Sequence, residues 1–146
     1  MLALRCSSRL PLPGAVEAAE RHFSPALLLS PRAMGGKTGM ELQFAFRLAA
    51  RAFEGKANIS SKASNEALLF LSREMNFASA LRAIGAADAH DFVLVCEKSP
   101  PLARVKKELG LVKATRLVLP KMGKKKGAYF EAERAVEQMA LARARN

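Results

Sequence analysis

The stretch from residue 37 to 96 constrains the fold most strongly, because it predicts three helices and a strand joined by short turns. Its first part, residues 40–54, carries one polar stripe at helical spacing, formed by Gln43, Arg47, Arg51 and Glu54. The other positions of this part are nearly all Ala, Leu, Met or Phe. We therefore expect a helix that packs against neighbours on more than one side.

The rest of this stretch predicts two further helices, over residues 63–72 and 77–84. Gly85 follows the third helix directly, where a left-handed residue commonly ends a helix, so we expect that conformation there. Residues 91–97 contain a short continuous apolar run, which is typical of a strand buried on both faces. The stretch thus supplies a layer of helices and one central strand.

The remaining sequence predicts further elements at the following positions: strands at 2–6, 26–29 and 116–119, and helices at 15–22, 101–109 and 128–144. The prolines fall between these elements or, for Pro101, at the first position of one, as expected for a residue that lacks a backbone N–H. With 146 residues, half of them apolar, the chain has the size of a single domain over residues 1–146. Strands separated by helices predict an α+β or small α/β fold, with one small sheet of about three to four strands covered by several helices.

Several short motifs of the central stretch are similar to those of a known family. They are residues 51–59 (Arg-Ala-Phe-Glu-Gly-Lys-Ala-Asn-Ile), Glu66 with residues 68–72 (Leu-Leu-Phe-Leu-Ser), and residues 80–85 (Ala-Leu-Arg-Ala-Ile-Gly), followed by the apolar strand. Together these motifs resemble the smallest, kinase-binding subunit of the KEOPS complex. The resemblance covers about 60 residues and extends to the rest of the chain only in length and order of elements.

The resemblance implies a non-catalytic, cytoplasmic accessory subunit. Such a subunit binds the small atypical kinase/ATPase of its complex and helps to bind transfer RNA for threonylcarbamoyl-adenosine modification. It needs no cofactor and has no small-molecule substrate of its own. Members of the family are also implicated in holding the single-stranded 3′ end of the RNA.

The distribution of charge agrees with an RNA partner. The chain has a net charge of +11, and residues 98–146 hold 13 Lys and Arg against 4 Asp and Glu. Four lysines lie between two glycines or beside them, at Lys121, Lys124, Lys125 and Lys126. Such a loop is either a solvated surface that keeps the protein soluble or a contact for a phosphate backbone. The resemblance adds a second candidate RNA patch, formed by Lys62, Arg73 and Arg82.

The candidate partner-binding residues lie on two helices. The predicted C-terminal helix has an apolar stripe that includes Ala135, Val136, Met139 and Ala142. This stripe suits either a partner helix or the chain's own sheet. The resemblance adds the helix from Glu66 to Ser72, including Leu69, while Glu66 has the alternative role of capping that helix or pairing with Arg51.

Residues 31–38 (Pro-Arg-Ala-Met-Gly-Gly-Lys-Thr) approach a phosphate-binding loop, since they follow an apolar run and precede a helix. Pro31 occupies the place of the first glycine, where it restricts the turn and removes an N–H donor. We therefore interpret the segment as a structural turn and expect no nucleotide hydrolysis. No other pattern indicates a catalytic group, and the two Cys and two His are not at metal-ligand spacing.

No apolar run reaches the length of a membrane span, and we interpret the N-terminus as a first strand and not as a targeting peptide. Two other function classes remain open beside the accessory subunit. One is a free-standing small basic RNA-binding protein, and the other is a degenerate nucleotide-binding protein that uses Lys37 and Thr38.

Overall fold

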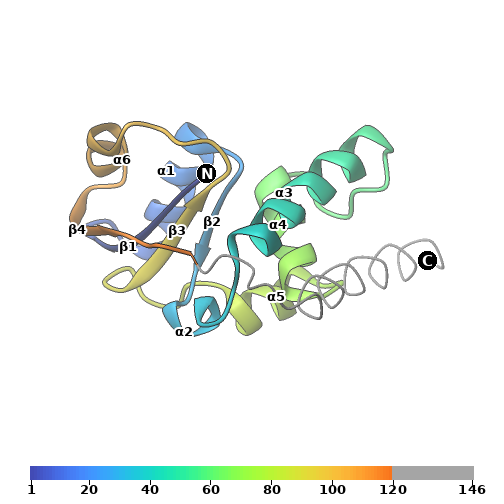
Figure 1. The fold of residues 1–146 in the computed structure, drawn as a ribbon, viewed down its shortest axis with the longest axis horizontal. Helices are drawn as coiled ribbons and strands as arrows, with labels where there is room; N and C mark the ends of the chain where they lie inside the picture. The colour runs from blue at the N-terminus through green and yellow to red at the C-terminus, as the bar shows by residue number, and fades with distance from the viewer. Residues whose placement is uncertain (120–146) are drawn as a thin grey trace.

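The computed structural model describes residues 1–119, and these form the α+β fold that the sequence predicts (Figure 1). The sheet has four strands: β1 (Leu2–Ser8), β2 (Ala26–Leu29), β3 (Phe92–Cys96) and β4 (Leu111–Arg116). Their order is β2-β3-β1-β4, and every neighbouring pair is antiparallel. β2 and β4 are therefore the two edge strands.

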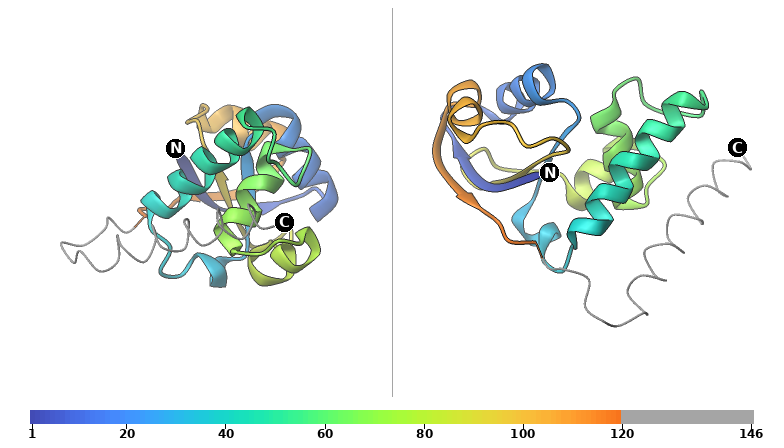
Figure 2. Two further views of the ribbon diagram at one scale, coloured as in Figure 1. Left: turned by 90° about the vertical axis from the view of Figure 1, so that its right-hand side faces the viewer. Right: turned by 45° about the horizontal axis from the view of Figure 1, so that its top comes forward.

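Helices cover the sheet on both faces (Figure 2). One face carries α1 (Leu12–Phe23) and α6 (Leu102–Glu108). The other face carries a layer that follows β2 in the chain: α2 (Pro31–Met34), α3 (Gly39–Glu54), α4 (Ala63–Ser72) and α5 (Phe77–Ile84). We call α3, α4 and α5 the helical layer.

The side chains of β3 divide the core into two clusters. Phe92, Leu94 and Cys96 pack with α1 and α6, while Val93 and Val95 pack with the helical layer. All five residues are buried, because successive side chains of a strand point to opposite faces of the sheet. The prediction of a strand buried on both faces is confirmed.

The start of α3 is fixed by a capping box. The Thr38 hydroxyl accepts a hydrogen bond from the Glu41 N–H at 3.2 Å, and the Glu41 carboxylate accepts one from the Thr38 N–H at 2.8 Å. Two N–H groups at the helix end are satisfied in this way. The predicted polar stripe of α3 is exposed along its length, so the apolar positions face the sheet and α4.

Gly85 differs from the prediction of a left-handed residue, since its φ is −67°. A Cβ atom at this position would lie 2.7 Å from the carbonyl oxygen of Leu81. Glycine is required because the chain passes close to the end of α5. From there it returns to β2, where the Ala86 N–H donates to the Leu28 carbonyl at 3.0 Å.

The last strand also differs from its prediction. The sequence predicts a strand at residues 116–119, whereas β4 spans Leu111–Arg116. Val118 belongs to the apolar run that suggested the strand, yet it is 96% exposed. The predicted C-terminal helix at residues 128–144 lies outside the described residues.

Candidate functional site

The surface formed by α6, β4 and the segments that flank them is strongly basic. Six exposed Lys and Arg residues lie in this part, and we call them the basic side: Lys98, Arg104, Lys106, Lys107, Lys113 and Arg116. Glu108 is the one acidic residue of residues 98–119, and its carboxylate lies 3.1 Å from the His22 ring. Little negative charge is therefore available within this segment to neutralise the basic side.

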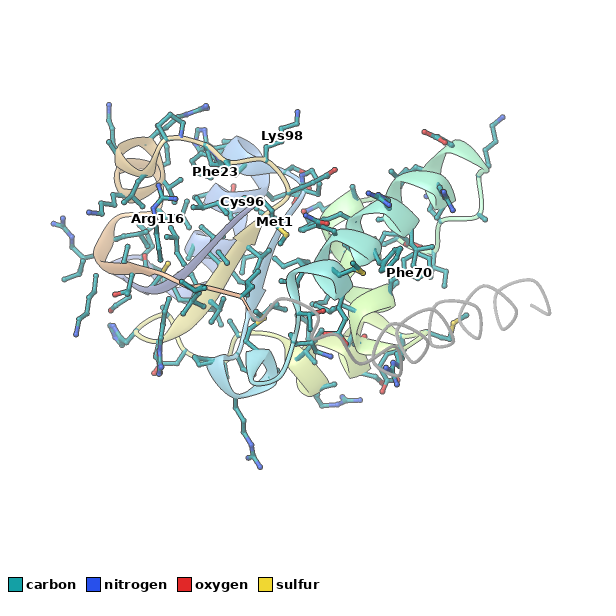
Figure 3. The ribbon with its side chains drawn as sticks, viewed as in Figure 1. Met1, Phe23, Phe70, Cys96, Lys98 and Arg116 are labelled. Carbon is teal, nitrogen blue, oxygen red and sulfur yellow. The ribbon has the colours of Figure 1, made fainter. Side chains whose placement is uncertain are left out.

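Two basic residues near this surface are already engaged. The Arg104 guanidinium lies 5.3 Å from the centroid of the Phe23 ring, which holds it toward α1. Arg5 on β1 forms an ion pair with Asp91 at 2.9 Å, and the Arg5 guanidinium lowers the pKa of the Asp91 carboxyl. Figure 3 shows Lys98 and Arg116 on the sheet part of the molecule, away from Phe70 in the helical layer.

The second predicted RNA patch includes residues at both ends of α4. Lys62 precedes α4 and Arg73 follows it, so the ten residues of α4 separate them by about 15 Å. All three residues of the patch are exposed, and the Arg82 guanidinium contacts the Ser79 hydroxyl at 3.2 Å. Lys62 and Arg73 thus lie at opposite ends of α4, while Arg82 lies in the last turn of the neighbouring helix α5.

Glu66 lies inside the protein, with no part of its surface exposed. Its carboxylate accepts hydrogen bonds from the backbone N–H groups of Ile59 at 3.1 Å and Ser60 at 2.8 Å. Glu66 thereby fixes the loop between α3 and α4. This role is structural, but it differs from the helix cap or the pairing with Arg51 that the sequence suggested. Leu69 is also buried, at 1% exposure. The prediction that these two residues contact a partner is wrong, because neither reaches the surface.

A groove of about 750 Å³ lies between α1, β2, α4 and α5. Its walls are mainly apolar, and Val16, Phe77 and Leu81 line it while remaining substantially exposed. At one end, the Ser64 hydroxyl donates to the Glu20 carboxylate and accepts from the Ala26 N–H at 2.9 Å. Lys62 also lines the groove, so a positive charge lies at its rim.

The segment that resembles a phosphate-binding loop forms a structural connection. Residues 31–34 form the one-turn helix α2, capped by the Ser30 hydroxyl, which accepts from the Ala33 N–H at 3.1 Å. Thr38, the residue that a phosphate-binding loop would use on a metal-bound nucleotide, caps α3 instead. This geometry favours the interpretation of residues 31–38 as a turn.

The two thiols are poor nucleophiles. Cys6 and Cys96 are buried and free, and burial raises the pKa of Cys6 to about 12 and that of Cys96 to about 11. Both thiols therefore stay protonated at neutral pH.

Within residues 1–119, no three His, Cys, Asp or Glu side chains gather as a metal site would require. In the same range, every helix is too short or too polar to cross a bilayer.

The remaining predicted site residues, Lys121, Lys124, Lys125, Lys126, Ala135, Val136, Met139 and Ala142, lie outside the described residues. The sequence reasoning missed the groove, because exposed apolar residues have no distinguishing pattern in a chain that is half apolar. It also missed the individual members of the basic side, although the charge excess after residue 97 pointed to them.

A comparison with protein-family models and with curated proteins finds no match to this chain.

Proposed function

We propose that this protein is a non-catalytic accessory subunit of a KEOPS-type complex, where it binds the small atypical kinase and helps to bind transfer RNA. The observation that carries the proposal is the resemblance of the central stretch, residues 51–85 with the strand that follows. In the structure this stretch forms the end of α3, α4 and α5, and then β3. The helical motifs of the resemblance therefore belong to the helical layer, and the strand that follows them belongs to the sheet against which this layer packs.

The RNA part of the proposal is supported by the basic side. Its Lys and Arg side chains are exposed and come from two neighbouring elements, α6 and β4, and from Lys98 in the segment before α6. Lysine and arginine at a surface attract the phosphate backbone of RNA without reading its sequence. Such a surface suits a subunit that holds transfer RNA while another subunit performs the chemistry. It would act in the cytoplasm.

The kinase part of the proposal rests on the resemblance and on the apolar stripe predicted for the C-terminal helix. With Glu66 and Leu69 inside the protein, the stripe with Met139 at its centre is the remaining candidate contact. Burying such a stripe against a partner helix would stabilise the complex through apolar contact.

The test is co-purification of this chain with the atypical kinase of its host. We expect the wild-type chain to retain the kinase, and Met139→Asp to lose it while circular dichroism shows a folded chain. Val118→Asp is the matched control, because Val118 is an exposed apolar residue near the same end of the chain, and it should retain the kinase.

The proposal fails if the wild-type chain does not bind the kinase and instead co-purifies with ribosomal proteins. That result would identify a free-standing RNA-binding protein. If Met139→Asp unfolds the chain, the stripe is part of the core, and a kinase contact must then be sought by substitutions on the exposed face of α3.

A further inference from the structure

The groove beside β2 has part of the outer edge of that strand as its floor. Residues 84–86 already pair with the far end of this edge, through the antiparallel bridge between Leu29 and Gly85. The Glu97 N–H donates to the Pro25 carbonyl at 3.3 Å, and hydrogen-bonded pairs alternate along an antiparallel ladder. Leu27 and Leu29 therefore direct their backbone groups toward β3, whereas Ala26 and Leu28 direct theirs toward the groove. Ala26, Leu27 and Leu28 all line the groove.

Two of the four outward groups are paired within the chain. The Ala26 N–H donates to the Ser64 hydroxyl at 2.9 Å, and the Leu28 carbonyl accepts from the Ala86 N–H at 3.0 Å. The other two, the Ala26 carbonyl and the Leu28 N–H, have no hydrogen-bond partner within residues 1–119. They lie between Ser64 at one end of the groove and Ala86 at the other.

These two free groups match the backbone of one added strand. A residue of a parallel strand opposite Leu27 would donate its N–H to the Ala26 carbonyl and accept the Leu28 N–H with its own carbonyl. An antiparallel strand would make the same two bonds with the two residues on either side of the one opposite Leu27. One of them would donate its N–H to the Ala26 carbonyl, and the other would accept the Leu28 N–H with its carbonyl. An extended peptide in either direction therefore offers a donor and an acceptor for these two groups, over the short stretch of edge between Ser64 and Ala86.

The walls of the groove suit the side chains of such a strand. Val16 of α1 is 47% exposed, while Phe77 and Leu81 of α5 are 39% and 44% exposed. They are three of the six large apolar residues that the structure exposes within residues 1–119. Because α1 and α5 cover opposite faces of the sheet, alternate side chains of an added strand would meet Val16 on one side and Phe77 and Leu81 on the other.

We propose that this groove binds a short, extended apolar segment of a partner protein, which adds to the edge of β2 as a further strand. The backbone bonds to Ala26 and Leu28 would supply the register, and the apolar walls would select apolar side chains at alternate positions. The inference goes beyond the proposed function, since it uses neither the basic side nor the C-terminal stripe.

The test selects peptides from a phage-displayed random heptapeptide library on the wild-type chain, after depletion on the Leu81→Asp variant. We expect peptides with apolar residues at alternate positions. Synthetic copies should bind the wild type and lose at least about tenfold in affinity to Leu81→Asp, which corresponds to about 1.4 kcal/mol. Val16→Asp on the opposite wall should weaken binding similarly, while Val112→Asp, an exposed valine of β4 outside the groove, should not.

A pair of N-methylated peptides tests the strand geometry. Adjacent amides of an extended chain point in opposite directions, so only one of two neighbouring N–H groups faces β2. Methylation of the amide that faces β2 should abolish binding, and methylation of its neighbour should leave affinity within about twofold.

The proposal is overturned if no peptide enriched in the selection depends on Leu81, or if the two methylated peptides bind equally. It is also overturned if single-stranded RNA binds in a Leu81-dependent manner and no peptide does, because the groove would then belong to the RNA. A folded state of both groove variants, checked by circular dichroism, keeps these outcomes distinct from unfolding.

Discussion

The helical layer and the basic side lie on the same sheet but differ in how their charges are used. Residues 39–84 hold six Lys and Arg against four Asp and Glu, whereas the shorter stretch of residues 98–119 holds six against one. In the helical layer, Glu41 and Glu66 make the caps and loop contacts that fix the fold. On the basic side, the positive charges are exposed at the surface. The comparison indicates that the first region builds the structure and the second is available for an anionic partner.

The largest effect is expected at Glu66, the buried carboxylate of the helical layer. Glu66→Ala would leave the N–H groups of Ile59 and Ser60 without their acceptor. We expect a loss of about 3 kcal/mol in the free energy of unfolding, measured by urea denaturation. Glu54→Ala, at an exposed end of α3, is the control and should change it by less than about 0.5 kcal/mol. A loss below about 1 kcal/mol at Glu66 would show that the loop does not depend on this residue.

A smaller effect is expected at Gly85, and a glycine on the opposite face gives the contrast. Gly85→Ala places a Cβ against the Leu81 carbonyl and should cost about 2 kcal/mol. Gly14 lies in α1, where an added Cβ meets only side-chain atoms at 3.7 Å, so Gly14→Ala should stabilise the protein by about 0.5 kcal/mol through helix propensity. Thermal denaturation of both variants would measure this. Equal destabilisation by both would contradict the packing described at α5.

The capping box at Thr38 should contribute about 1 kcal/mol. Thr38→Ala removes the acceptor for the Glu41 N–H, and urea denaturation should report the loss. Thr115→Ala, at an exposed position of β4, should be neutral.

The same Thr38 variant distinguishes a cap from a nucleotide site. If the wild-type chain bound magnesium-ATP with micromolar affinity, and both Thr38→Ala and Lys37→Ala abolished binding, residues 31–38 would be a nucleotide site.

The smallest effect on stability is expected on the basic side. Lys106, Lys113 and Arg116 are exposed, and no ion pair joins them to another residue of 1–119. The triple change of these residues to Ala should therefore alter the free energy of unfolding by less than about 0.5 kcal/mol per site. A larger loss in denaturation experiments would mean that this region also builds the fold.

Sequence patterns predicted the helical layer well, because its elements carry strong local signals. The helices over residues 63–72 and 77–84 and the strand over 26–29 have the predicted bounds. β4 was missed because it is an edge strand in which most side chains are exposed, so it lacks an apolar run. The turn of helix α2 was missed because Pro31 was interpreted only as a break, although Pro is favoured at the first position of a helix.

Candidate contacts were harder to predict than elements, since burial depends on packing between distant segments. Glu66 looks like an ordinary charged residue near the start of a helix, and only the fold places it beneath the loop at Ile59 and Ser60. Lys62 and Arg73 are close to the same helix in sequence, but the length of α4 keeps them apart. The open edge of β2 depends on strand order, which a single sequence does not reveal.

The most direct test of the account is the salt dependence of transfer RNA binding in two variants that lose the same charge. One carries Lys106, Lys113 and Arg116 changed to Ala on the basic side, and the other carries Arg32, Arg47 and Arg51 changed to Ala on exposed positions of α2 and α3. We predict that the first weakens binding and makes the log–log salt slope shallower by about two to three, while the second keeps both within about half a unit of wild type. Equal weakening in both variants would contradict the account, because binding would then follow net charge and not the basic side.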